Sequence, residues 1–445
     1  MHLVRIGGRG VLLDCGLFQG LKELRLRNWG PPPRIAPHAV DAVVLSHAHI
    51  DHTGYLPLLA RHGFQGPVYC TPGTADLLRI LLPDSARLLE EETARANRHG
   101  YSKHHPALPL YTAADAQDAL ALLEPRSYGA PFTPAPGAAV RYRRAGHILG
   151  AATVQLDLDG PGGARLVFSG DLGRWDRPIL RDPELVPEAD VLLLESTYGD
   201  RVHAAGVDDD LARVVREGAA RGGAILIPAF AVGRTQELLW RIRRLEDAGA
   251  IPILPVYLDS PMAVEVTDVY ARHPEDHDLE MATLRAGGGP LRTRQFDIAR
   301  TPEESKALSR RRGPLVIIAG SGMATGGRIL HHLSQRLPDP RTTVLMAGFQ
   351  AAGTRGRSLR DGARTLRMFG RDVPVQARIE CLDALSAHAD RDELLRWLGG
   401  FTRPPRATYL VHGEPAAAES LARTVRERFG WPVRAAVDGE TIALI

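Results

Sequence analysis

The chain has 445 residues, more than one hydrophobic core ordinarily supports, so two domains are expected. Hydrophobic residues make up 44% and charged residues 24% of the sequence, as in folded globular proteins, and a formal charge of only +3 excludes a polycation. No apolar run approaches the roughly 18 residues of a membrane span and no secretory leader is evident, so we expect a cytoplasmic protein without a membrane partner.

Short apolar stretches that end in polar loops recur along the chain, and many are followed by helical periodicity, the pattern of an α/β protein. Strands are predicted at Asp41–Ser46, Arg165–Ser169, Val191–Glu195, Ala224–Pro228, Val256–Asp259, Leu315–Ala319, Val344–Ala347 and Thr408–Val411. Helices are predicted at Tyr55–Arg61, Ala86–Arg98, Gly233–Asp247, Arg328–Arg336, Arg391–Leu398 and Ala417–Phe429. Segments rich in proline and glycine are interpreted as loose, and these are Gly30–Pro37, Pro131–Gly137 and Ala286–Pro290.

The most specific chemical signal is the stretch Leu45-Ser-His47-Ala-His49-Ile-Asp51-His52. It follows a predicted strand and precedes a helix that begins near Gly54, so its side chains lie in a loop at the carboxyl end of a strand. Four potential ligands so close together can converge on a metal ion, whereas a solvated polar loop would account for only one or two of them.

That loop alone leaves a metal incompletely coordinated, so further ligands are expected downstream. Three candidates have the same placement at strand ends: His147 in Ala145-Gly-His147-Ile-Leu-Gly150, Asp171 in Phe168-Ser-Gly-Asp171, and His412 in Leu410-Val-His412-Gly-Glu414. An isolated histidine is more often a satisfied polar residue than a ligand, so each candidate is weak by itself.

Taken together, these motifs resemble the metallo-β-lactamase superfamily, and in particular its β-CASP nucleases, the family of ribonuclease J and of the endonuclease subunit of the cleavage and polyadenylation factor. The resemblance covers nearly the whole chain. Further matching stretches are Leu12-Leu-Asp14-Cys-Gly16, Glu195-Ser-Thr-Tyr-Gly-Asp200, Asp259-Ser-Pro-Met-Ala263, Gly320-Ser-Gly-Met323 and Ser386-Ala-His388-Ala-Asp390.

The resemblance implies an αββα metallo-β-lactamase sandwich with an inserted α/β β-CASP domain. The expected metallo-β-lactamase domain comprises residues 1–199 and 385–445, and the expected inserted domain comprises residues 200–384. The resemblance also implies a further strand before Met1, so that the chain begins inside the family's first hairpin. Either the start site has been assigned too late, or the first strand is absent, which would leave an unpaired sheet edge.

Carried over residue by residue, the resemblance implies a centre of two zinc ions, with manganese as the alternative metal. The implied ligands of one zinc are His47, His49 and His147, those of the other are Asp51, His52 and His412, and Asp171 bridges the two. Asp14 matches the family's early aspartate, which we interpret as an acceptor that fixes the tautomer of a ligand histidine.

The implied reaction is hydrolysis of single-stranded RNA. Phosphodiesters repel nucleophiles, and two metals lower the pKa of a bridging water toward about 7 while binding the oxygens on which charge develops. We therefore expect a zinc-dependent ribonuclease that acts by attack of a metal-bridging hydroxide, with Asp51, His388 and Glu195 as catalytic residues. His388, held by Glu195, would protonate the departing ribose oxygen. His412 favours RNA, because the DNA-repair branch of the family carries an apolar residue there.

The stretch Gly320–Gly327 follows a predicted strand and opens the helix near Arg328. It lacks the spacing and the acidic partner of a dinucleotide fingerprint, so nicotinamide binding is rejected. Its backbone amides, with Ser321 and Arg328, could hold an RNA phosphate, and a tight packing turn is the equal alternative. The neighbouring pair His331-His332 is interpreted as structural.

Endonuclease action is expected rather than 5′-exonuclease action, because the long extensions of ribonuclease J are not seen after His412. A homodimer is a further expected partner.

One alternative function is that of a small-molecule hydrolase of the same fold, such as a lactonase, thioesterase or β-lactamase, but such enzymes do not need the long segment between Glu195 and His388. A second rival is a scaffold with a decayed metal site, against which the intact ligand set argues.

Overall fold

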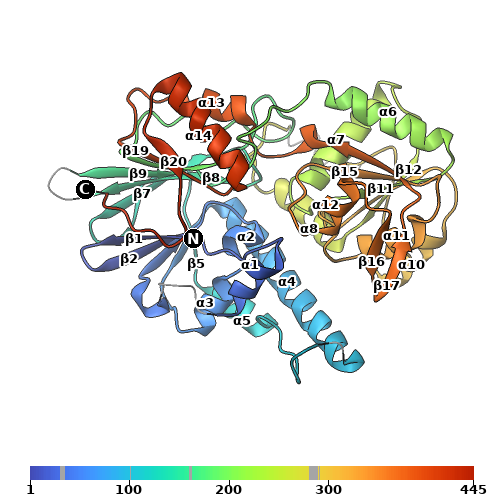
Figure 1. The fold of residues 1–445 in the computed structure, drawn as a ribbon, viewed down its shortest axis with the longest axis horizontal. Helices are drawn as coiled ribbons and strands as arrows, with labels where there is room; N and C mark the ends of the chain where they lie inside the picture. The colour runs from blue at the N-terminus through green and yellow to red at the C-terminus, as the bar shows by residue number, and fades with distance from the viewer. Residues whose placement is uncertain (31–35, 101, 160–162, 280–288, 290, 445) are drawn as a thin grey trace. The chain divides into compact units, whose positions relative to one another are not determined.

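The computed structural model describes residues 1–30, 36–100, 102–159, 163–279, 289 and 291–444. The chain divides into two compact units (Figure 1). The first comprises Met1–Gln19, Glu23–Val202 and His388–Ile445, and the second comprises Gly20–Lys22 and His203–Ala387. The predicted bounds of the inserted domain, residues 200–384, nearly coincide with the segment His203–Ala387 of the second unit. No helix in the described part of the chain is long and apolar enough to cross a membrane.

The first unit is a sandwich of two sheets. One sheet has the order β1 (His2–Ile6), β2 (Arg9–Leu13), β3 (Ala42–Val44), β4 (Val68–Cys70) and β5 (Leu123–Pro125). The other has the order β20 (Val433–Ala435), β19 (Ala407–Val411), β10 (Val191–Glu195), β9 (Ala164–Phe168), β8 (Ala152–Leu158), β7 (Ala138–Arg144) and β6 (Phe132–Ala135). Inward side chains of both sheets, such as Val11, Val44, Val154 and Phe168, form one buried cluster, as expected for two sheets packed face to face.

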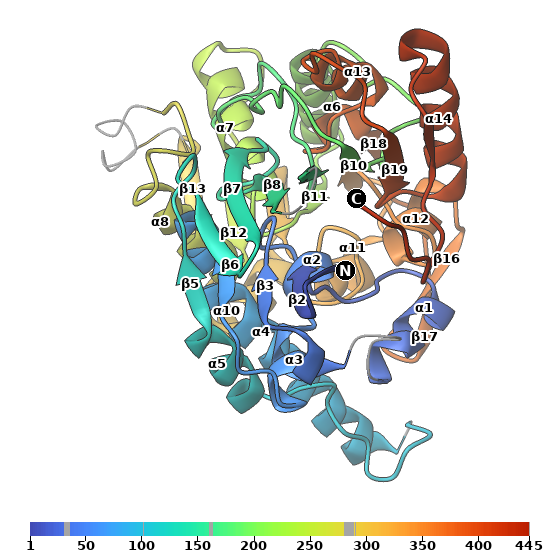
Figure 2. The same ribbon diagram turned by 90° about the vertical axis from the view of Figure 1, so that its left-hand side faces the viewer.

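Helices cover the outer faces of this sandwich, which confirms the αββα arrangement (Figures 1 and 2). They are α1 (Lys22–Leu26), α2 (Ile50–Thr53), α3 (Leu56–Arg61), α4 (Pro72–His99), α5 (Ala113–Ala121), α13 (Arg391–Leu398) and α14 (Pro415–Phe429). The predicted helix Ala86–Arg98 is the second half of α4. The helix begins earlier, at Pro72, where Thr71 caps its amino end by accepting a hydrogen bond from the Thr74 amide.

The sheet topology gathers strand ends at one place. Strand β10 pairs in parallel with both β9 and β19, so the carboxyl ends of these three strands lie at the same edge of the sheet. Strand β3 is likewise parallel to β2 and β4. Because ligands in α/β sheets gather beyond the carboxyl ends of strands, this edge is the expected place for a functional site.

The second unit is a doubly wound α/β domain. Its sheet has only parallel pairs, in the order β13 (Gln295–Ile298), β12 (Pro255–Asp259), β14 (Leu315–Ala319), β11 (Ala224–Pro228), β15 (Thr343–Ala347) and β18 (Arg378–Leu382). A hairpin of β16 (Thr365–Met368) and β17 (Arg371–Pro374) accompanies it. Its helices are α6 (Val207–Ala220), α7 (Arg234–Asp247), α8 (Pro261–Tyr270), α10 (Pro302–Arg310), α11 (Ile329–Arg336) and α12 (Arg355–Arg360).

Buried apolar clusters lie on both faces of this second sheet, one packed with residues of α6, α7 and α8 and the other with residues of α10, α11 and α12. The sequence of a strand that is buried on both faces is a continuous apolar run rather than an alternating pattern. For this reason β11, β14 and β15 could be predicted from the sequence. The loose segment expected at Pro131–Gly137 is wrong, since Phe132–Ala135 form β6. Most of Gly30–Pro37 and of Ala286–Pro290 lies outside the described residues.

Candidate metal centre and active site

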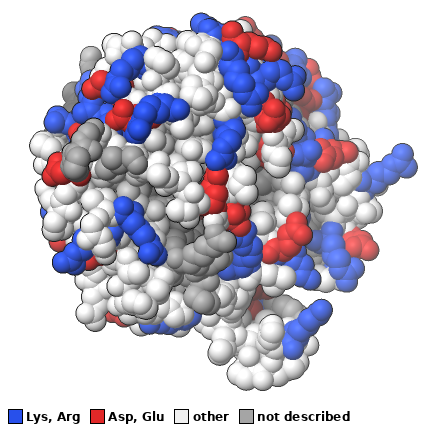
Figure 3. Space-filling model, turned by 60° about the vertical axis from the view of Figure 1, so that its left-hand side comes forward, with Lys and Arg blue, Asp and Glu red and all other residues white. Residues whose placement is uncertain are grey.

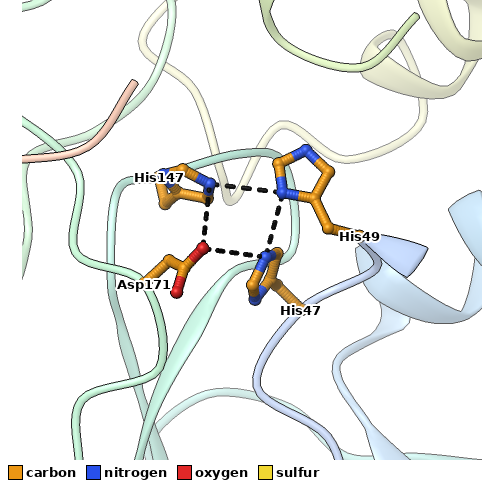
Figure 4. A group of neighbouring side chains, drawn as sticks. All are labelled: His47, His49, His147 and Asp171. Carbon is orange, nitrogen blue, oxygen red and sulfur yellow. Dashed lines mark hydrogen bonds and ion pairs between the residues drawn. The ribbon is translucent and has the colours of Figure 1, made fainter. Parts of the chain in front are cut away.

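The seven predicted metal ligands converge in the first unit. His47 and His49 come from the loop after β3, His147 from the loop between β7 and β8, and Asp171 from the loop after β9 (Figure 4). His47 Nε2 lies 3.0 Å from His49 Nδ1, and His147 Nε2 lies 3.3 Å from the same nitrogen. Asp171 Oδ2 lies 3.5 Å from the Nε2 atoms of both His47 and His147.

These separations fit a tetrahedral ion. Zinc bonds of ~2.0–2.1 Å to nitrogen and oxygen place neighbouring ligand atoms roughly 3.3 Å apart. Three imidazoles and one carboxylate are also a donor set suited to zinc. Imidazole nitrogens and a carboxylate oxygen that converge in a buried site are stabilised by a cation, so this group of side chains fits a metal ion.

A second group of candidate ligands lies beside the first and consists of Asp51, His52 and His412. His412 Nε2 lies 3.2 Å from His52 Nε2 and 3.5 Å from Asp51 Oδ2. Asp171 turns its other oxygen to this side, with Oδ1 3.4 Å from His52 Nε2. Oδ1 is buried and has no hydrogen-bond partner among the described residues. The two oxygens of one carboxylate thus face two groups of candidate ligands, an arrangement that a bridging ligand would require.

Asp14 and Ser46 stand behind the ligand histidines. Asp14 Oδ2 lies 2.6 Å from His52 Nδ1 and accepts a hydrogen bond of 2.8 Å from Ser46 Oγ. Ser46 Oγ in turn lies 3.0 Å from His47 Nδ1, and the Ser46 amide donates to Asp14 Oδ1. Asp14 therefore orients one ligand histidine directly and contacts a second through Ser46. Ser46 was missed as a functional residue, although it lies inside the histidine motif.

Close backbone packing ties the loops of His147 and Asp171 together. The Gly173 amide donates a 2.7 Å hydrogen bond to the Ala145 carbonyl. A Cβ atom at Gly173 would lie 2.0 Å from the Gly146 carbonyl oxygen, so a larger residue would force the two loops apart. Gly173, two residues after Asp171, is therefore needed to bring Asp171 close to His147.

The candidate ligand histidines differ in their pKa values and therefore in their charge states. Burial holds the pKa values of His47 and His147 well below the usual range, so both rings are neutral and can offer a lone pair to a metal. Burial also acts to lower the pKa of His412, but Asp171 and Asp51 outweigh it and raise that pKa to about 10. Metal binding at His412 must therefore release a proton.

Glu195 and His388 meet next to the ligands. His388 Nδ1 lies 3.3 Å from Glu195 Oε1 and 3.2 Å from Oε2, and Glu195 is fully buried. Glu195 Oε1 also accepts a 2.6 Å hydrogen bond from the Leu172 amide, next to Asp171. Burial lowers the pKa of His388, but Glu195 and Asp171 together raise it above its ordinary value. A protonated imidazole near neutral pH is what a general acid requires.

The predicted phosphate contacts lie in the second unit. Ser321 Oγ accepts hydrogen bonds from the amides of Thr325 and Gly326. Arg328 donates to Asp259 Oδ1 at 2.6 Å and to the carbonyls of Ala299 and Arg300. These contacts serve the loop and its packing, and a role in RNA binding stays a prediction.

Arginine on the surface is largely accompanied by acidic residues. Figure 3 shows one face of the molecule, on which basic side chains stand beside acidic ones. In the first unit, Arg165 donates to both Asp157 and Glu188. Exposed pairs of this kind contribute little stability and are common on protein surfaces. Paired arginines of this kind therefore do not by themselves indicate a surface that binds nucleic acid.

Comparisons with known proteins agree with this geometry. Residues 9–217 match the beta-lactamase superfamily domain, residues 235–359 the Beta-Casp domain, and residues 372–436 the Zn-dependent metallo-hydrolase RNA specificity domain. Ribonuclease TTHA0252 of Thermus thermophilus is 38% identical over 444 residues, which cover 99% of this chain and 96% of that protein. The transcription termination factor FttA of Methanosarcina mazei is 31% identical, with 98% of this chain and 68% of that protein covered. The chain belongs to the β-CASP family of the metallo-β-lactamase superfamily.

Proposed function

We propose that the protein is a zinc-dependent ribonuclease that cleaves single-stranded RNA internally. The observation that carries the proposal is Asp171, whose two oxygens face two separate ligand groups, beside the buried Glu195 and His388 pair. A relative named as a ribonuclease covers nearly the whole chain, and the carboxyl-terminal match is named for RNA specificity. Both support RNA as the substrate.

Two zinc ions are the proposed cofactors, with manganese as the alternative. His47, His49, His147 and Asp171 would hold one ion, and Asp51, His52, His412 and Asp171 would hold the other. When bound, the ions would supply a water of lowered pKa and positive charge for the phosphate oxygens. The metal-ligand role of each residue is part of the proposal.

His388 is the proposed proton donor to the departing ribose oxygen. Glu195 holds the imidazole through Nδ1, so that Nε2 is the nitrogen left to meet the substrate. The carboxylate also favours the charged form of the ring, which keeps the proton available near neutral pH. Asp51 was predicted from the sequence to be both a ligand and a catalytic residue. Its Oδ2 lies 3.5 Å from His412 Nε2, and in this proposal it acts as a ligand of the second metal ion.

A small-molecule hydrolase, the alternative from sequence, is not favoured. The chain matches the Beta-Casp and RNA specificity domains in addition to the lactamase domain. Endonuclease action, a homodimer and a cytoplasmic location are predictions from the sequence that complete the proposal.

The decisive experiment offers the purified protein several substrates side by side. These are circular and end-labelled single-stranded RNA, matched DNA and a chromogenic lactam, each with and without a chelator. We expect metal-dependent cleavage of both RNAs, including the circle, which has no end. Cleavage of end-labelled RNA alone would replace the endonuclease with an exonuclease, and turnover of the lactam alone would overturn the ribonuclease proposal. Bound zinc, measured by elemental analysis, should approach two ions per chain.

A further inference from the structure

The backbone at His412 is held in an unusual conformation. His412 has a φ of 51°, in the left-handed region that residues with a side chain seldom adopt. Such a conformation is strained and persists only where its surroundings enforce it. The contacts around His412 should therefore include the groups that hold this ligand in place.

The end of β10 supplies those contacts. Ser196 Oγ donates a 2.9 Å hydrogen bond to the Val411 carbonyl, just before His412. On the other side, a Cβ atom at Gly413 would lie 2.3 Å from Ser196 Oγ and 2.7 Å from the Ser196 carbonyl oxygen. The turn of His412 is thus packed directly against the residues that follow Glu195.

Thr197 makes the most specific of these contacts. Its hydroxyl oxygen Oγ1 lies 2.9 Å from the His412 carbonyl oxygen and 3.2 Å from His412 Nδ1. The carbonyl can only accept, so the single hydroxyl proton is donated to it. The hydroxyl oxygen then has lone pairs left, and it can accept a hydrogen bond only if Nδ1 carries a proton.

The other ring nitrogen faces the ligands. His412 Nε2 lies 3.2 Å from His52 Nε2 and 3.5 Å from Asp51 Oδ2. Nδ1 also lies 3.2 Å from Asp171 Oδ1, but that oxygen has no hydrogen-bond partner among the described residues. Thr197 is therefore the hydrogen-bond partner of Nδ1, and a protonated Nδ1 leaves the lone pair of Nε2 to the metal.

We propose that Thr197 is a positioning residue for His412, because its one hydroxyl fixes both the left-handed turn and the ring tautomer that directs Nε2 to the second metal position. Glu195 holds His388 and Thr197 holds His412, so one short stretch at the carboxyl end of β10 orients an acid and a ligand together. This inference rests on the proposed metal centre, and it can be tested without RNA.

The test compares Thr197→Val with Thr197→Ser, since valine keeps the shape and serine keeps the hydroxyl. Thr408→Val is the matched control, because Thr408 lies on β19, before His412, and its buried Oγ1 has no hydrogen-bond partner among the described residues. Zinc affinity is measured by competition with a chromogenic chelator. We expect Thr197→Val to weaken the binding of one of two zinc ions by ~10–100-fold, the usual effect of losing a group behind a metal ligand. Thr197→Ser and Thr408→Val should bind both ions within a few-fold of the wild type.

Equal affinity of Thr197→Val and the wild type for both ions would overturn the proposal, as would equal losses in the valine and serine variants. A measurement on the wild type guards against a valine variant that does not fold. In zinc-loaded protein with ¹⁵N-labelled histidine, the His412 signals, assigned by their loss in His412→Gln, should show the proton on Nδ1. A proton on Nε2 would refute the assignment. If the wild type binds two zinc ions without cleaving RNA, the proposed function fails while this inference stands.

Discussion

A buried cluster of ionisable side chains in each unit can be compared, and the two clusters differ in how their polar atoms are satisfied. In the second unit, the Asp259 cluster consists of Asp259, Ser305, Arg328 and His332. Asp259 Oδ1 accepts from Arg328 at 2.6 Å, and Oδ2 accepts from Ser305 Oγ at 2.5 Å and contacts His332 Nε2 at 2.6 Å. Both oxygens of this fully buried carboxylate therefore have donors.

In the first unit, the ligand cluster is arranged in the opposite way. Ring nitrogens face each other, as between His47 and His49 or between His52 and His412, and Asp171 Oδ1 has no hydrogen-bond donor within the described residues. Ring nitrogens and a carboxylate oxygen that converge in a buried site without a complete set of hydrogen bonds cost free energy, which a bound cation would offset. A complete set of donors is thus typical of a structural network, whereas converging imidazole nitrogens beside a carboxylate oxygen without a donor favour a metal site.

The largest expected effect comes from removing the acid beside the ligand cluster. His388→Ala should lower the rate of RNA cleavage by ~10²–10⁴-fold, the usual contribution of a general acid, because the leaving oxygen loses its proton donor. Zinc content should stay at the wild-type value, since His388 is outside the proposed ligand set. Single-turnover cleavage and elemental analysis of the same samples check both parts. A parallel loss of metal would make His388 a ligand instead, and His331→Ala, at an exposed histidine of the second unit, is the control.

The Asp259 cluster should respond in stability rather than in metal content. Asp259→Ala leaves Arg328 and His332 without their shared partner, and removing one member of a buried ion pair typically costs about 3–5 kcal/mol. We expect the urea unfolding of the second unit to shift to lower concentration while zinc binding in the first unit stays unchanged. Asp361→Ala, which removes a half-exposed partner of Arg357 at the surface, should leave the unfolding curve unchanged. Zinc loss in Asp259→Ala would break the contrast between the clusters.

A smaller effect is expected from the aspartate behind the ligands. Asp14→Asn keeps a residue that tolerates the left-handed φ of 56° at this position, but removes the charge that orients His52. Loss of such a partner typically weakens metal affinity by ~10–100-fold. Chelator competition measures this change. An unchanged affinity would mean that Ser46 and the backbone alone hold the histidines.

The fold and the convergence of the candidate ligands were largely predictable because their signals are local. The histidine motif lies within one loop, and the other ligands stand directly after apolar strands, so strand order alone brings them to one edge of a sheet. The parallel sheet of the second unit was legible from continuous apolar runs. The segment Pro131–Gly137 was misread because proline in an edge strand needs no partner for its missing amide, and β6 lies at the edge of its sheet.

Thr197 and Asp259 could not be assigned their contacts from the sequence, because their partners are far away along the chain. Thr197 meets His412 across 215 positions, and Asp259 meets His332 across 73. Nothing local distinguishes such a threonine or aspartate from any other polar residue at a strand end. Only the tertiary structure shows which residues they contact. His332 was interpreted from the sequence as structural, and its burial and its hydrogen bond to Asp259 agree with that interpretation.

The smallest expected effect is a pH dependence confined to the Asp259 cluster. Burial raises the pKa of Asp259, but hydrogen bonds from His332, Ser305 and Arg328 outweigh it and hold the pKa below its ordinary value. A carboxyl group with a lowered pKa stabilises the folded state above its unfolded pKa of about 3.9, and this contribution is lost as the pH falls toward the folded pKa. The difference in unfolding free energy between wild type and Asp259→Asn should therefore be constant from pH 7 to about pH 5 and shrink below pH 4. Urea titrations across this range measure it, and a difference that grows on acidification would show that the carboxylate is not the stabilising form.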